Sequence, residues 1–322
     1  MNMIKYLVID SGGTKTAAIL YGEDLRRIAV CTAGSLRSNT TPDALYESHA
    51  EELISALGVK GEEIETVCGT FEDRAVSLFR KYCKINNSRR DGEMELGLCA
   101  AGLFGDSVLA LCGTGATAFA RVNGQRLVFG GYGAAVSDEG SGYYIGRRAF
   151  EAAIRDHEGR GPETLLTDVL ADHLAGLTRE NFRQAVYTVY ADNGRSPVAM
   201  VARCVPAVIK AAEAGDVTAK DILEDAGKIT GSLVTALIKK YGLDPDIPVA
   251  VSGSVWRANP LFYNGFVSVY GKDPIIPLIE PVAGAVAKAI YDKTGKFDGK
   301  DAEYVASQYP EFRYSIDKPK NA

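Results

Sequence analysis

The sequence predicts an α/β protein built from two domains. Its 322 residues exceed the size at which a single hydrophobic core usually stops growing. A unit of strand, glycine turn, strand, turn and strand occurs twice, beginning near Tyr6 and again near Ser107. Amphipathic helical segments follow each unit. We therefore expect an N-terminal domain over residues 1–106 and a C-terminal domain over 107–322, closely joined because no low-complexity linker separates them.

The first unit begins with a hairpin. Residues 6–9 and 16–21 are rich in β-branched and apolar side chains, and a polar turn with two glycines joins them. A third strand is expected over 27–31. A helix follows, with Thr41 as its predicted N-cap and Gly58 just beyond its end.

The remaining elements follow from the same periodicities. In the first half we expect a strand over 65–68 and helices over 75–82 and 93–101. The second unit should place strands at 108–112, 118–122 and 127–129. Later segments have helical periodicity, apart from one strand at 249–251: 139–156, 162–174, 196–214, 217–241 and 281–291. The polar tail after Lys293 is expected to pack loosely.

Composition excludes several classes of function. The net charge of −5 provides no basic surface for nucleic acid or for an anionic membrane. The N-terminus has no signal-peptide pattern, and no apolar stretch is long enough to span a bilayer, so a cytoplasmic location is expected. The six cysteines form no CxxC pair, which favours buried reduced thiols over disulfides or a zinc site.

The turn from Asp10 to Thr16 is the first segment that indicates chemistry. Gly12 and Gly13 allow the backbone to approach phosphate oxygens, and Thr14 and Lys15 add side-chain donors. Asp10 ends a strand, where its carboxylate can hold hydrated Mg²⁺. Taken alone, a glycine pair in such a turn favours a plain tight hairpin with polar turn residues. The segment is not a Walker A loop, because the spacing differs and a strand follows it.

Two later segments have similar chemistry. Gly113 to Thr117 forms a second glycine–threonine turn, so two loops could enclose one triphosphate. After the flexible segment 130–133, Asp138 and Glu139 precede a helix. These carboxylates could cap that helix, which is the simpler interpretation, or accept hydrogen bonds from the hydroxyls of a polar substrate.

In their order and spacing, these segments resemble the BadF/BadG/BcrA/BcrD-type ATPases and, within that group, the N-acetylglucosamine kinases of the actin, Hsp70 and hexokinase superfamily. The resemblance covers residues 4 to about 292. The matching motifs are DSGGTKT (10–16), CGTGATA (112–118), GGYG (130–133), DEGSGYYIG (138–146), AGD (214–216), SGSVW (252–256) and EPVAGA (280–285). The resemblance implies two RNase H-like (actin-like ATPase) domains with an interdomain cleft.

The resemblance also implies roles for matching positions. Asp10 would hold Mg²⁺ through water. The ATP-binding residues would be Gly12, Gly13, Thr14 and Lys15 at the β- and γ-phosphates, Thr114 and Gly115 at the γ-phosphate, and Gly215, Gly253 and Ser254 beside the adenosine. The sugar would contact Asn39, Gly131, Tyr132, Gly133 and Asp138.

One position departs from the pattern of the sugar kinases. These kinases carry a catalytic Asp on the helix before the second loop, where this chain has Glu93. Glu95 is the alternative base, and Asp91 a more distant one. A glutamate can also deprotonate a hydroxyl, but it is one methylene longer, and small misplacement of a base lowers the rate strongly.

The resemblance thus implies an ATP- and Mg²⁺-dependent kinase that phosphorylates an amino sugar such as N-acetylglucosamine, glucosamine or N-acetylmuramic acid. Two alternatives remain. One is an activating ATPase of the dehydratase-component type, which couples ATP hydrolysis to electron transfer through an iron–sulfur cluster. The scattered cysteines disfavour it. The other is a non-catalytic sugar or nucleotide sensor. A homodimer is one expectation for the assembly, since dimers are common among such kinases.

Overall fold

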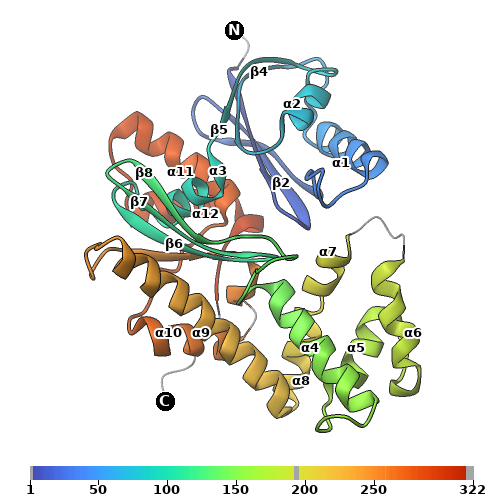
Figure 1. The fold of residues 1–322 in the computed structure, drawn as a ribbon. Helices are drawn as coiled ribbons and strands as arrows, with labels where there is room; N and C mark the ends of the chain where they lie inside the picture. Colours follow the sequence, from blue (N-terminus) through green and yellow to red (C-terminus); the bar gives the residue numbers. More distant parts are fainter. Residues whose placement is uncertain (1–2, 192–195, 258, 317–322) are drawn as a thin grey trace. The chain divides into compact units, whose positions relative to one another are not determined.

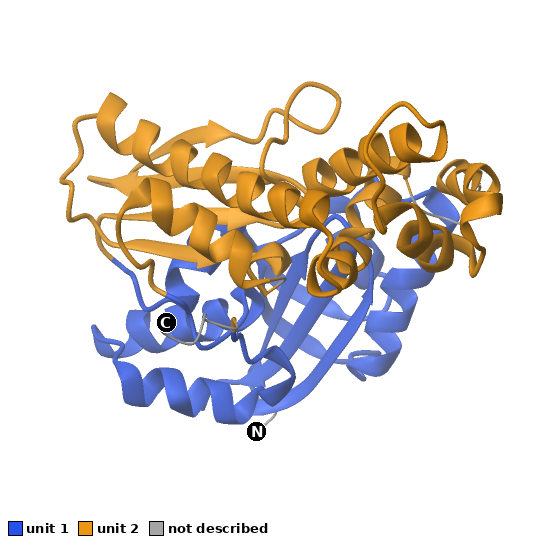
Figure 2. Cartoon of the chain, turned by 90° about the horizontal axis from the view of Figure 1, so that it is seen from below, with its two compact units in different colours: residues 1–104, 276–315 blue, residues 105–275, 316–322 orange. Residues whose placement is uncertain are grey.

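The chain folds into two compact units, which Figure 2 shows in different colours. The structure is a computed structural model that describes residues 3–191, 196–257 and 259–316. Unit 1 extends to Phe104 and also contains Ile276–Ser315, whereas Gly105–Ile275 forms the body of unit 2. The division at Phe104 lies two residues before the expected boundary. The expectation that all later residues belong to the second domain is wrong for residues 276–315.

Unit 1 is a five-stranded sheet with helices on both faces. The strand order is β3-β2-β1-β4-β5, and β4 pairs parallel to both β1 and β5. The strands are β1 Lys5–Ser11, β2 Lys15–Gly22, β3 Arg27–Gly34, β4 Glu63–Thr70 and β5 Lys84–Arg90. One face packs against α1 (Asp43–Ala56) and α2 (Asp73–Phe79), and the other against α3 (Gly92–Ala100), α11 (Pro281–Thr294) and α12 (Gly299–Gln308).

Residues 276–315 belong to unit 1 because their apolar side chains are buried in its core. Val282 and Val286 of α11 share a buried core with Val8 of β1. The α11 and α3 helices also approach closely, because a Cβ at Gly284 would lie 2.2 Å from the carbonyl oxygen of Leu96. The segment after Lys293, expected to pack loosely, instead forms α12 and buries side chains including Val305.

Unit 2 contains a four-stranded sheet of order β8-β7-β6-β9. Its strands are β6 Ser107–Cys112, β7 Ala116–Val122, β8 Gln125–Gly130 and β9 Val249–Ser252. Helix α9 (Val217–Lys240) contacts β6, β7 and β8, and α10 (Pro260–Tyr270) packs against α9. The other helices are α4 Gly142–His157, α5 Leu166–Ala175, α6 Phe182–Tyr187, α7 Pro197–Ala202 and α8 Val205–Glu213. Figure 1 shows α5 to α8 gathered away from the sheet.

The two sheets repeat one arrangement, as the sequence predicted. In each, a three-stranded antiparallel meander is extended by a parallel neighbour of its first strand, β4 beside β1 and β9 beside β6. Both neighbours bring a glycine of positive φ against that first strand. A Cβ on Gly69 or Gly253 would lie 2.2 Å from the carbonyl oxygen of Ile9 or Cys112, respectively. The glycine–threonine loops therefore occupy equivalent positions, after β1 and after β6.

Two smaller findings complete the description. Thr41 does not cap α1, because its hydroxyl donates to the carbonyl oxygen of Ser35 at 3.2 Å and the helix begins after Pro42. Gly58 does follow the helix end with a left-handed φ of 64°, as expected. Within the described part of the chain, no helix combines the length and apolar character needed to cross a membrane.

We expect Gly284→Ala to lower the free energy of unfolding by about 1–3 kcal/mol, because the new methyl group forces α11 away from α3. Gly299→Ala is the matched control, since a Cβ there meets nothing within 4 Å. Urea unfolding of both variants measures the difference. Equal stabilities would show that α11 shifts without cost.

Candidate phosphate-binding and catalytic site

The first loop is a tight turn whose two ends carry buried hydroxyl groups that hydrogen-bond to each other and to the neighbouring segment. The amide of Gly12 donates to the carbonyl oxygen of Lys15 at 2.9 Å. Ser11 and Thr16 are fully buried, and the Thr16 hydroxyl donates to Ser11 Oγ at 3.2 Å. The amide of Leu36 donates to both hydroxyl oxygens, at 3.1 and 3.0 Å. Ser11 thus connects the loop to the segment after β3.

That segment also binds the backbone carbonyls of the first loop. Ser35 Oγ donates to the carbonyl oxygen of Gly12 at 2.7 Å, and Arg37 Nε donates to that of Ser11 at 2.7 Å. Because these carbonyls are engaged within the protein, they are not presented to an approaching anion. Thr14 and Lys15 remain exposed at the tip.

Asp10 lies in a region of concentrated negative charge. Burial, together with the nearby charges of Glu93 and Glu280, raises the pKa of this carboxyl to about 7, although Arg37 and Lys15 oppose the shift. Lys15 forms an ion pair with Glu280, with 3.1 Å between Nζ and Oε2. Three carboxylates therefore gather around the loop with two cations, an arrangement that favours an additional cation.

The oxygen donors present fit a hydrated Mg²⁺. Thr70 is the partner of Asp10 in the parallel register of β4 and β1, and its Oγ1 is buried with no hydrogen-bond partner among the described residues. Mg²⁺ typically keeps several waters and binds one or two carboxylates together with substrate phosphates. In the described part of the chain, no group of three or more His, Cys, Asp or Glu side chains could hold a metal ion.

Glu93 is the candidate base that binds a residue attached to the first loop. It lies in the first turn of α3, and its Oε1 accepts a hydrogen bond from Arg37 Nη2 at 2.5 Å. Glu95 projects about 200° around the helix from Glu93, where it accepts from Cys99 Sγ at 3.6 Å. Asp91 forms an ion pair with Arg89 at 2.8 Å. Of these three carboxylates, Glu93 is the one connected to the loop through Arg37.

The turn that carries Asn39 is anchored by a carboxylate. Glu72 Oε1 accepts from the amide of Ser38 at 2.9 Å and from its hydroxyl at 3.1 Å. Asn39 itself is exposed in this turn. Its amide group can therefore meet a polar ligand without breaking the anchor.

The second loop is attached to the start of α4. The carbonyl oxygens of Gly113 and Thr114 accept from the amides of Gly142 and Tyr143 at 2.8 and 3.1 Å. Gly115 adjoins a carboxylate, because a Cβ at this position would lie 3.1 Å from Asp138 Oδ2. The structure thus brings the predicted phosphate residues Thr114 and Gly115 beside the predicted sugar residue Asp138.

Asp138 does not cap the helix that follows it. The cap is Ser141, whose Oγ accepts from the amide of Tyr144 at 3.1 Å. Burial raises the pKa of Asp138, whereas hydrogen bonds from the backbone of Gly133 and Ala116 oppose that rise. The simpler interpretation from the sequence is therefore wrong for this carboxylate, which binds the backbone of the glycine segment and of β7 instead.

The glycine segment 130–133 adopts a conformation that few other residues tolerate. Gly130, Gly131 and Gly133 all have positive φ, between 69° and 87°. The amide of Gly131 donates to the carbonyl oxygen of Ala116 at 3.0 Å. Tyr132 between them is 73% exposed. The segment therefore turns beside the second loop and leaves an aromatic ring in solvent.

The predicted adenosine residues lie in two places. Gly253 packs on Cys112 at the base of the second loop, and Ser254 beside it is exposed. Gly215 instead precedes Asp216, which caps α9 by accepting from the amide of Ala219 at 2.7 Å.

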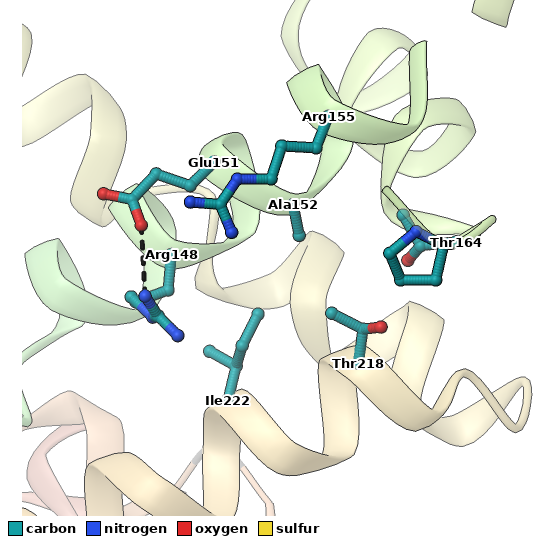
Figure 3. A pocket seen from close by; sticks show the side chains of 8 residues that line it. Arg148, Glu151, Ala152, Arg155, Thr164, Thr218 and Ile222 are labelled. Carbon is teal, nitrogen blue, oxygen red and sulfur yellow. Dashed lines mark hydrogen bonds and ion pairs between the residues drawn. The ribbon is translucent and has the colours of Figure 1, made fainter. Parts of the chain in front are cut away.

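A small pocket of 120 Å³ lies near the start of α9 (Figure 3). Its lining includes Thr164, which donates to Asp216, and the ion pair between Arg148 and Glu151. Ligand pockets usually exceed about 300 Å³, so this pocket by itself does not accommodate a nucleoside. None of the residues predicted to bind ATP or sugar lines it.

The raised pKa of Asp10 predicts pH-dependent stability. The pKa of Asp10 is about 7 in the folded protein, above the ordinary value of 3.8. As the pH rises between these two values, the unfolded chain ionises more readily than the folded one, so the folded state loses stability. Without nucleotide or metal, Asp10→Asn should therefore stabilise the protein by up to ~4 kcal/mol above pH 7 and by little near pH 4. Unfolding measured in EDTA across this range tests the sign. A difference that does not depend on pH would contradict it.

Known proteins resemble this chain over most of its length. The model of the BadF/BadG/BcrA/BcrD ATPase family matches residues 7–289. The N-acetylmuramic acid/N-acetylglucosamine kinase of Clostridium acetobutylicum is 27% identical over 279 residues, which cover 82% of this chain and 89% of the kinase. The N-acetyl-D-glucosamine kinase of Dictyostelium discoideum is also 27% identical, over 77% of this chain and 84% of that enzyme.

Solved structures confirm the two-domain α/β fold expected from the resemblance. A candidate N-acetylglucosamine kinase from Chromobacterium violaceum has a TM-score of 0.68 at 22% identity, covering 88% of this chain and 98% of that one. A ROK-family glucokinase from Streptomyces griseus, solved with glucose and AMPPNP, has a TM-score of 0.54 at 13% identity, with 89% and 98% covered. Since the family model spans most of the sequence, the chain belongs to the BadF/BadG/BcrA/BcrD ATPase family.

Proposed function

We propose that this protein transfers the γ-phosphate of ATP to a hydroxyl of an amino sugar such as N-acetylglucosamine, glucosamine or N-acetylmuramic acid. One observation supports the proposal most directly: Glu93 binds Arg37, which in turn binds the carbonyl oxygen of Ser11 in the first loop. The two amino-sugar kinases that are 27% identical over most of this chain support the substrate class.

In the proposed reaction, the sugar hydroxyl attacks the γ-phosphorus in line and its proton passes to Glu93. The bond from the γ-phosphorus to the bridging oxygen breaks, which releases ADP. Asn39 and Asp138 hold other hydroxyls of the sugar, so that the reacting hydroxyl is oriented before transfer. Gly131, Tyr132 and Gly133 line the sugar.

The phosphates are bound by both loops. Gly12, Gly13, Thr14 and Lys15 contact the β- and γ-phosphates, and Thr114 and Gly115 contact the γ-phosphate. Lys15 is 57% exposed in its pair with Glu280, so its ammonium group can move to the phosphates at small cost. Gly215, Gly253 and Ser254 flank the adenosine.

Asp10 and Thr70 would hold the waters of Mg²⁺. The ion would neutralise charge on the transferring phosphoryl group. In this protein, the raised pKa of Asp10 reflects the cost of keeping that carboxylate ionised before the cation binds.

The cysteines disfavour the alternative of an iron–sulfur ATPase. Five of the six are buried, and Cys31 is partly exposed. Burial raises the pKa of Cys68 to about 12, which opposes the thiolate form that clusters require. Stoichiometric iron in anaerobically purified protein would revive this alternative.

The proposed function predicts that amino sugars accelerate ADP release from Mg·ATP and yield a sugar phosphate. The measurement is a coupled assay over the three sugars named above, with glucose for comparison and the product detected by mass spectrometry. Sugar binding by calorimetry with no turnover at high enzyme concentration would instead support the non-catalytic sensor.

Glu93→Gln should lower the rate of transfer by about 10²–10⁴-fold, the usual contribution of a general base, and leave ATP affinity nearly unchanged. Glu95→Gln is the matched comparison on the same helix and should retain most activity. Single-turnover kinetics and ATP titrations separate the two effects. A larger loss of transfer rate in Glu95→Gln than in Glu93→Gln would identify Glu95 as the base.

A further inference from the structure

We propose that Arg37 is a positioning residue that fixes the carboxylate of Glu93 relative to the first phosphate loop, an inference that rests on the proposed kinase function. One guanidinium group makes both connections. Its Nε donates to the carbonyl oxygen of Ser11 at 2.7 Å, and its Nη2 donates to Glu93 Oε1 at 2.5 Å. Because the guanidinium is planar and rigid, the two bonds set a fixed relation between the loop and the carboxylate.

Arg37 is itself held at its backbone. Its amide donates to Ser35 Oγ at 3.2 Å, and that hydroxyl donates to the carbonyl oxygen of Gly12 at 2.7 Å. The preceding amide, of Leu36, donates to the buried Ser11 Oγ at 3.1 Å. The backbone at Arg37 is therefore already bound to the loop. The guanidinium group then fixes Glu93 relative to that loop.

Glu93 needs such a partner more than an aspartate would. Its side chain has one more rotatable bond and is 40% exposed, so packing alone does not select one rotamer. The side chain of Arg37 is less exposed, at 29%, and it hydrogen-bonds to both Ser11 and Glu93. The glutamate at this position and the arginine thus form a matched pair, in which the extra methylene supplies the reach to Arg37.

Arg37 also acts on Asp10, because its charge lowers the pKa of that carboxyl. A loss of activity on removing Arg37 could therefore pass through Asp10 and the cation, or through a direct contact with phosphate. The test must separate these routes from the route through Glu93.

A double-mutant cycle makes that separation. Arg37→Met should lower kcat by roughly 10–100-fold, the effect expected when a base is misplaced, with the KM for ATP changed by less than about threefold. The same change made on top of Glu93→Gln or Glu93→Asp should have little further effect, since the carboxylate that Arg37 positions is then already absent or withdrawn. Arg37→Lys should recover only part of the rate, because an ammonium group cannot make both bonds in the same geometry.

Arg27 and Glu311 provide the matched control in unit 1. This ion pair is bidentate, at 2.7 and 2.8 Å, and Arg27 is 32% exposed, close to the value for Arg37. Arg27→Met should lower Tm by as much as Arg37→Met does and leave kcat unchanged. A parallel fall of kcat in both variants would mean that Arg37 is merely structural.

An unchanged kcat in Arg37→Met would overturn the proposal, and so would a full Arg37→Met loss that persists in both Glu93 backgrounds. Absence of transfer to every sugar would refute the proposed kinase function instead. The same cycle is then measured on ATP hydrolysis by water, in which Glu93 would activate the attacking water. No coupling between Arg37 and Glu93 in that reaction would also overturn the proposal.

Discussion

Excess negative charge at the carboxyl end of β1 is the constraint on which the rest of the site depends. Asp10, Glu93 and Glu280 come from three different elements, and Arg37 and Lys15 offset them incompletely. Such a cluster costs folding free energy when no ligand is present, but it attracts a cation and then a polyphosphate that carries one. The buried Thr70 hydroxyl also costs folding free energy when no ligand is present, because it has no hydrogen-bond partner in the described chain. The ligand-free protein is therefore less stable because of the same groups that would bind the ligand.

Much of the fold could be predicted because the chain repeats one local pattern. Alternating strands and glycine turns indicated both meanders, and the structure has them in the same order. The polar strand β5 was missed because its residues are mostly exposed and show no apolar alternation. Helix α10 was missed because Gly265 and several aromatic residues obscure its helical periodicity. The return of α11 and α12 to unit 1 depends on long-range packing, which no local pattern encodes.

The site divides in the same way. Asp10 and the two loops are contiguous motifs, so the sequence alone indicated them. The resemblance already favoured Glu93 over Glu95 as the base, and the structure adds the hydrogen bond between Glu93 and Arg37. Arg37 and Thr70 gave no signal of their own in the sequence, since a single arginine after a strand or a single threonine in an apolar segment is ordinary. Their significance comes from contacts and burial that arise only in the folded chain.

The division of the chain has a consequence for how the protein is made. Unit 2 is contiguous from Gly105 to Ile275, whereas unit 1 is completed only by Ile276–Ser315. During synthesis from the N-terminus, the first five strands emerge early but lack α11, whose valines cover one face of their sheet. Unit 2 can therefore finish folding before unit 1 does. The nascent chain carries an open apolar sheet face until its last helices emerge, and this interval is when it is most exposed to aggregation and most in need of chaperones.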